Sequence, residues 1–137
     1  MVFLRGQCPQ DLDTAANIES HDPVEQTHKV MQNIRQLITE AGGEMAHLGK
    51  VVVYLTDVRH REAVYRTMGE YIKGVHPVST GLVVQALARP EWLVEIDGTG
   101  GFPDSTGYGG GARSAALRLR GQPTAPARAG AAGQAPG

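Results

Sequence analysis

The fold of this 137-residue chain is decided by one stretch, Lys50-Val51-Val52-Val53-Tyr54-Leu55-Thr56-Asp57. Its first six residues form a nearly continuous apolar run rich in β-branched side chains, which predicts a strand covered on both faces. Thr56-Asp57 ends the strand, and the Asp57 side chain can cap a helix over residues 59–73. Gly74 ends that helix. The stretch therefore predicts a buried strand followed directly by a helix.

The clearest helix signal lies upstream, at Asp22-Pro23-Val24-Glu25. It combines a capping Asp, a Pro at the first helical position and a Glu three residues after the cap. Apolar residues then recur at helical spacing until Gly42-Gly43 supplies a left-handed stop. We predict an amphipathic helix over residues 23–41.

Three further segments predict strands, namely residues 2–4, 82–87 and 92–96. The resulting order of strand, helix, strand, helix, strand, strand indicates an α+β fold with both helices packed on one face of the sheet. Because the strand over residues 50–55 is apolar on both sides, we expect the other face to be buried against another subunit.

The composition changes near residue 98. Residues 98–137 hold 11 of the 18 glycines and 4 of the 8 prolines, with few large apolar side chains. Such a segment cannot bury enough apolar surface to offset its ordering entropy. We therefore predict one folded domain over residues 1–97 and a disordered tail over residues 98–137, with Gly98-Thr99-Gly100-Gly101 interrupting the last strand.

The charges and the single cysteine limit the classes of partner. Residues 1–97 carry 9 basic and 13 acidic side chains, a net charge of 9 − 13 = −4, which gives no drive toward nucleic acid. Cys8, expected as an exposed thiol in a turn beside Pro9, excludes an intrachain disulfide and fits a reducing compartment. No apolar run approaches the roughly 20 residues of a membrane span, and no signal-peptide core is evident. We expect a cytoplasmic protein with no membrane partner and, because its histidines are dispersed, no metal site.

Five blocks of sequence, in the same order and spacing, resemble the Rid (YjgF-like) family across residues 2–97. Each block alone is common, but five in register are specific. The blocks are Phe3-Leu4-Arg5-Gly6-Gln7, Gln26-Thr27 with Asn33-Ile34 and Leu37, Ala41-Gly42-Gly43, residues 50–57, and His76-Pro77 through Val94-Glu95-Ile96.

The resemblance implies a chorismate-mutase-like fold and a homotrimer, in which three sheets form a barrel with the helices outside. It also implies a small-molecule cleft at each subunit interface. The activity implied is the hydrolysis, or deamination, of reactive enamines and imines such as 2-aminoacrylate, with no cofactor and no metal. In the family a further strand precedes the first one found here, so we expect an exposed sheet edge.

Residue by residue, the resemblance implies that Glu95 positions water and that Gly6 offers its backbone to the ligand. The family's carboxylate-binding arginine is missing, and Ser79 falls at its position if the turn before Glu95 holds one extra residue. Tyr65 replaces an asparagine of the second helix. Arg5 is a candidate for a substitute cation, although neighbours in a strand point to opposite faces, which counts against Arg5 and Gly6 acting together.

Two functions therefore remain open. The first is a Rid-type hydrolase of small enamines or imines in which Glu95 positions water. The second, favoured by the missing arginine, is a non-catalytic trimer of the same family that binds a small molecule or a protein.

Overall fold

The structure is a computed structural model that describes residues 1–102. Predictions that concern residues 103–137 lie outside the described residues. Within residues 1–102 no helix is long and apolar enough to cross a membrane.

Helix α1 (Pro23–Glu40) forms where the capping signal predicted it. The Asp22 side chain accepts a hydrogen bond from the Val24 N–H at 2.9 Å, which satisfies one of the free donors of the first turn. Past the helix end, Gly42 has a φ of 87°, in the left-handed region that favours glycine. The predicted helix over residues 23–41 is thus confirmed to within one residue.

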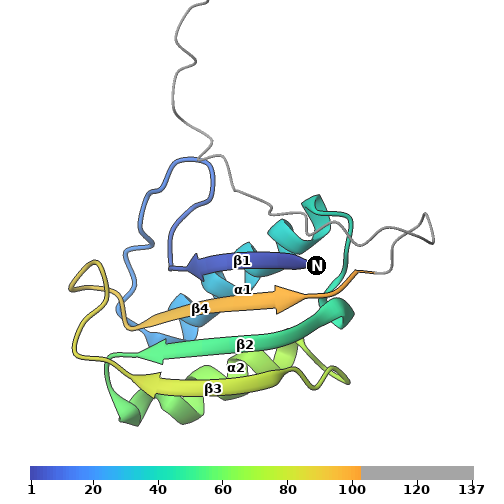
Figure 1. Cartoon of the computed structure of the whole chain (residues 1–137). Coiled ribbons are helices and arrows are strands. Elements are labelled where there is room, and N and C mark those ends of the chain that lie inside the picture. The colour runs from blue at the N-terminus through green and yellow to red at the C-terminus, as the bar shows by residue number, and fades with distance from the viewer. Residues whose placement is uncertain (103–137) are drawn as a thin grey trace, which may run out of the picture.

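Four strands form one mixed sheet in the order β1-β4-β2-β3. Strand β2 pairs in parallel with β3, whereas β4 runs antiparallel to both β1 and β2. Their bounds, and that of helix α2, are β1 Val2–Gln7, β2 Leu48–Leu55, α2 Arg61–Tyr71, β3 Val78–Val83 and β4 Val94–Gly100. Both helices lie behind the sheet in Figure 1, so the predicted α+β arrangement with helices on one face is confirmed.

The core lies between the sheet and the two helices. Alternate residues of β2, namely Val51, Val53 and Leu55, are at most 1% exposed. They share one cluster with Ile34 of α1 and Val64 of α2. The alternation of buried and half-buried residues along β2 shows that one face of the sheet packs on the helices.

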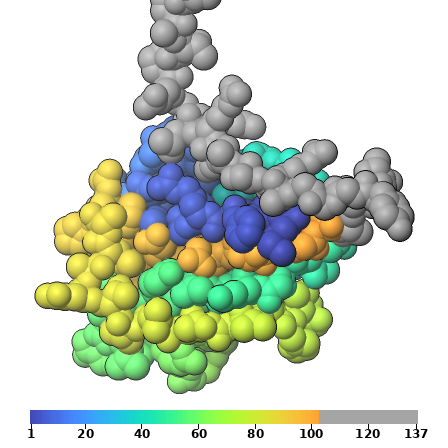
Figure 2. All heavy atoms as spheres, in the orientation of Figure 1, coloured from blue at the N-terminus to red at the C-terminus, as the bar shows by residue number. Residues whose placement is uncertain are grey.

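The other face of the sheet is not covered by any described element. Figure 2 shows this face, with β1, β4, β2 and β3 side by side and no helix across them. Three large apolar side chains on it are exposed, namely Phe3, Val78 and Leu82 at 52%, 67% and 45%. We call this surface the open face; it also carries Val52 and Tyr54 of β2, both half-buried.

Two strand predictions were wrong in position. Strand β3 forms at Val78–Val83 rather than at residues 82–87, because it pairs residue by residue with Lys50–Leu55 of β2. Strand β4 is not interrupted at Gly98 but continues to Gly100, beyond the predicted domain end at residue 97. Pairing with β1 on one side and β2 on the other holds this glycine-rich segment by its backbone.

Candidate active site

Glu95 and Gly6 meet on the open face. Glu95 lies opposite Tyr54 in the β4–β2 register, and both of its neighbours, Val94 and Ile96, are fully buried on the helix side. A Cβ atom built on Gly6 would lie 2.8 Å from Cδ of Glu95 and 3.0 Å from its Cγ, with Oε1 nearer still. Any side chain at residue 6 would therefore displace the Glu95 carboxylate.

An irregularity in β1 brings Arg5 to the same side as Gly6. The register with β4 shifts between Leu4 and Gln7, as in a β-bulge. Both of these residues are buried, so the two residues between them are turned away from the core. The alternation argument against Arg5 is thus wrong for this strand, because the bulge breaks the period of two.

Cys8 follows the strand and contacts Glu95. The thiol is half-buried, and its hydrogen bond to Glu95 is one of several causes of an unusual pKa. Burial, followed by the charge of Glu95 and this hydrogen bond, raises the pKa of Cys8 to about 12, while the nearby Arg5 acts in the opposite direction. Cys8 is therefore a hydrogen-bond donor to the carboxylate, not the exposed thiol that the sequence suggested.

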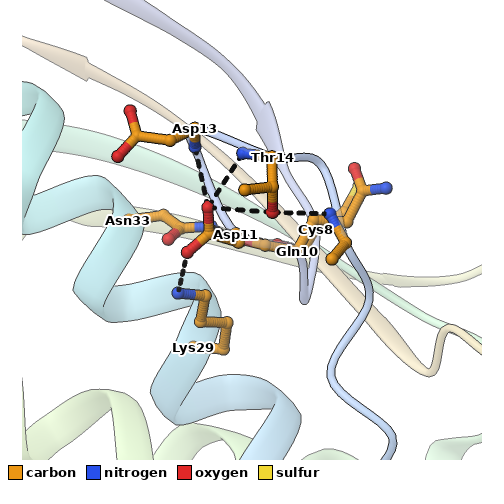
Figure 3. Close-up of polar contacts among 8 residues, drawn as sticks. Cys8, Gln10, Asp11, Asp13, Thr14, Lys29 and Asn33 are labelled. Atoms are coloured by element: carbon orange, nitrogen blue, oxygen red, sulfur yellow. Dashed lines mark hydrogen bonds and ion pairs between the residues drawn. The ribbon is translucent and has the colours of Figure 1, made fainter. Parts of the chain in front are cut away.

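The loop after Cys8 is fixed on helix α1. Asn33 is 2% exposed, and its amide nitrogen donates to the carbonyls of Cys8 at 3.2 Å and Gln10 at 2.8 Å. Asp11 accepts hydrogen bonds from the backbone N–H groups of residues 13 and 14 at 2.9 Å and lies 3.7 Å from Lys29. Figure 3 shows these contacts between the loop and the helix. The helix therefore determines where Cys8 sits relative to Glu95.

On the other side of Glu95, Tyr54 makes the open face polar. Its hydroxyl donates to Oδ2 of Asp97 at 3.1 Å. This hydrogen bond, with smaller effects from burial and from the charges of Asp97 and Glu95, raises the pKa of Tyr54. Glu95 is thus flanked by the thiol that follows β1 and by a phenol on β2, both protonated at neutral pH.

The structure places Ser79 and Tyr65 together but apart from Glu95. The hydroxyl groups of Ser79 and Tyr65 lie 3.3 Å apart. Ser79 pairs with the buried residue Val51, so its side chain is on the helix side of β3, whereas Thr80 pairs with Val52 and faces the open side. Within the chain the five predicted site residues therefore form two groups, Arg5 with Gly6 and Glu95, and Tyr65 with Ser79.

A buried amide to which sequence analysis assigned no role supports the segment that leads into Glu95. Gln26, 1% exposed, donates to the carbonyls of Ser20 at 3.0 Å and Glu91 at 2.9 Å and accepts from the N–H of Leu93 at 2.8 Å. These bonds join helix α1 to the segment that enters β4. Polar residues within the apolar stripe of α1, Gln26 and Asn33, were the signal that could have revealed this role.

The fold and the site define a small α+β protein with an acidic side chain on an uncovered sheet face. A family model described as Endoribonuclease L-PSP matches residues 1–100. The chain belongs to this family, which includes the Rid and YjgF proteins, and the expected membership is confirmed.

Relatives and solved structures agree with this assignment. Protein DfrA of Myxococcus xanthus is 33% identical over 97 residues, covering 71% of this chain and 72% of the relative, and a RutC family protein of Pyrococcus abyssi is 30% identical over 96 residues, covering 70% and 74%. The structure of the Rid family protein YyfA of Yersinia pestis matches with a TM-score of 0.68 at 28% identity, covering 73% of this chain and 79% of that one. NMB1025 of Neisseria meningitidis, a YjgF family member, matches at 0.65 and 29% identity, covering 75% and 80%.

Proposed function

We propose that the chain hydrolyses small reactive enamines or imines and that Glu95 positions the attacking water. The observation that carries the proposal is the Glu95 carboxylate on the open face, kept clear by Gly6 and held by the Cys8 thiol. A carboxylate within hydrogen-bonding reach of water is a suitable general base. The missing side chain at Gly6 leaves room for the Glu95 carboxylate against the backbone of β1.

The proposed chemistry needs no group beyond water and the protein. The water oxygen forms a bond to the imine carbon, the C=N π pair moves to nitrogen, and the proton lost by water passes by way of Glu95 to that nitrogen. The hydroxyl proton of the resulting carbinolamine then passes to the amine nitrogen, and an oxygen lone pair forms the C=O bond as the C–N bond breaks, which releases ammonia and a carbonyl compound. The Cys8 thiol donates a hydrogen bond to one lone pair of the Glu95 carboxylate, which limits the rotation of Glu95. The remaining lone pairs of the carboxylate can accept hydrogen bonds from water.

The two groups of site residues support a site between copies of the chain. Glu95 on β4 and Ser79 on β3 are separated by β2, so their strands are roughly 10 Å apart. Their side chains also point to opposite faces. One small ligand can touch both groups only if they come from different subunits, which fits a homotrimer with interface clefts. Burial of the open face in such a trimer would also explain the exposed side chains of Phe3, Val78 and Leu82.

A second candidate function is a trimer that binds a ligand without catalysis, and the lack of a cation on β3 supports it. Neither Ser79 nor Thr80 offers a cation on β3, so no arginine of that strand holds a substrate carboxylate. Cleavage of RNA, which the description of the family names, is less favoured here, because residues 1–102 carry a net charge of 9 − 13 = −4.

Assays on the full chain separate these functions. Imines generated in situ should be hydrolysed by the wild type, and Glu95→Gln should lower kcat/KM roughly 100-fold or more, because positioned general bases contribute at least that much. Glu19→Gln, an exposed acid outside both groups, is the matched control and should behave as the wild type. Equal rates for the wild type and Glu95→Gln would remove the proposed role, and thermal-shift binding of metabolites without any turnover would favour the binding function.

A further inference from the structure

Arg61 is a cation that the sequence resemblance does not assign. It is the first residue of α2, and its guanidinium carbon lies 4.3 Å from the centre of the Tyr65 ring. Stacking of this type holds a guanidinium in place while its N–H donors remain available. Arg61 is therefore oriented by the residue that pairs with Ser79.

The Arg61 guanidinium reaches the strand at Gly81. A Cβ built on Gly81 would lie 2.5 Å from Nη1 of Arg61 and even closer to the Tyr65 hydroxyl oxygen. The Tyr65 and Ser79 hydroxyls are 3.3 Å apart. A charged fork and two hydroxyl groups thus converge on the space that the missing side chain of Gly81 leaves at the edge of the sheet.

The acidic residues near Arg61 form ion pairs with other arginines, so the Arg61 guanidinium has no ion-pair partner among residues 1–102. The other arginines near it are paired, Arg59 with Asp57 at 2.6 Å and Arg66 with Glu62 at 2.5 Å. Among residues 1–102, no carboxylate lies within ion-pair distance of the Arg61 guanidinium. A group of one cation and two neutral donors with no acid is suited to an anion.

We propose that Arg61 binds the carboxylate of the ligand, in place of the arginine that Ser79 replaces. That the anion is a substrate carboxylate rests on the proposed function. Arg5 is the less suitable cation, because Arg5 and Glu95 both lie close enough to Cys8 to affect its pKa, so the Glu95 charge would repel a ligand carboxylate bound there. Arg61 lets the carboxylate bind at one group of residues while the electrophilic carbon reaches Glu95 of a second copy.

Titration of the full chain with pyruvate and with its neutral amide, followed by ligand-observed NMR, tests this assignment. Arg61→Ala should weaken pyruvate binding about 10- to 100-fold, as expected for loss of hydrogen bonds to a charged partner, and leave binding of the amide unchanged. Arg61→Lys should keep part of the preference for pyruvate, because it keeps the charge but not the fork. Arg66→Ala, an exposed arginine of the same helix, is the matched control and should leave both titrations unchanged.

Three results would overturn the assignment: wild-type pyruvate binding by Arg61→Ala, equal loss of pyruvate and amide, or loss of the pyruvate preference in Arg5→Ala instead. Failure of the proposed function looks different. If the wild type prefers pyruvate through Arg61 but hydrolyses no imine, the carboxylate site stands and the hydrolase does not. If Glu95→Gln is inactive while Arg61→Ala keeps full hydrolysis and pyruvate binding, only the assignment of Arg61 fails.

Discussion

Replacing Gly6 by alanine is the smallest change that should disturb the proposed site without disturbing the core. The added Cβ would lie 2.8 Å from Cδ of Glu95, closer than carbon atoms approach without covalent contact, so the Glu95 side chain must rotate. Rotation removes the hydrogen bond from Cys8 and moves the carboxylate from the position proposed for water. The clash involves the end of a half-buried side chain on the open face, so the backbone of β1 and the packed side of the sheet need not move.

The expected effect is therefore larger on activity than on stability. Forcing a χ angle of Glu95 about 30° from its rotamer costs about 0.5–1.5 kcal/mol, which is the expected loss in free energy of unfolding for Gly6→Ala. Loss of a positioned base should lower kcat/KM by at least roughly 100-fold. Gly49→Ala is the matched control, because a Cβ in that strand position meets only the Thr99 carbonyl oxygen, at 3.7 Å. Steady-state imine hydrolysis and urea unfolding measure the two effects, and a fully active Gly6→Ala beside an inactive Glu95→Gln would refute the argument that Gly6 keeps the carboxylate in place.

Three further changes test the framework of the site. Gln26→Leu removes three buried hydrogen bonds and should cost about 3 kcal/mol, a drop of roughly 10–20 °C in Tm by calorimetry, whereas a smaller change would show that water replaces the amide. Because burial and the Glu95 charge raise the pKa of Cys8 from 9.0 to about 12 in the folded chain, its contribution to stability is complete below pH 9 and is lost as the pH rises toward 12. Urea unfolding of Cys8→Ser should lack this part of the pH dependence, and identical slopes for the two proteins would contradict the raised pKa of Cys8. Gly69→Ala, at an exposed helical position with nothing within 4 Å of the new Cβ, should raise the free energy of unfolding by about 0.5–1 kcal/mol, and a loss would show strain that the helix does not reveal.

Local signals explain which parts of the fold could be predicted. Helix α1 carries its own start and stop in Asp22, Pro23 and Gly42, and the run from Val51 to Leu55 predicts a buried strand without knowledge of its partners. Strand β3 was misplaced because it lies at the sheet edge with all six residues exposed, so no alternation of apolar residues marks its register. The extension of β4 through Gly98 depends on strands on both sides, which no local propensity reports.

The site, too, divides into residues that the sequence could identify and contacts that depend on the pairing of distant strands. Glu95 and Gly6 could be named from the family resemblance, and the structure brings them together. The contact of Cys8 with Glu95 depends on a bulge in β1, and bulges leave little trace in sequence. Ser79 was named from a count of residues across a turn, and a difference of one residue decides whether a strand side chain faces the helices or the open face.

A site shared by two copies of the chain can be tested by combining two variants that each disable one of its two groups of residues. Glu95→Gln should be inactive for want of its base, and Ser79→Asp should be inactive because its added carboxylate would repel a ligand carboxylate beside Tyr65 and Arg61. The two variants are co-expressed and the mixed assemblies are isolated. If Glu95 and the Ser79 group act on one ligand from different subunits, each mixed trimer should show about one third of wild-type activity, since one of its three interfaces has both groups intact. Mixed assemblies as inactive as their parents would contradict a shared site. They would indicate that both groups act from the same subunit, since no subunit of the mixture carries both groups intact.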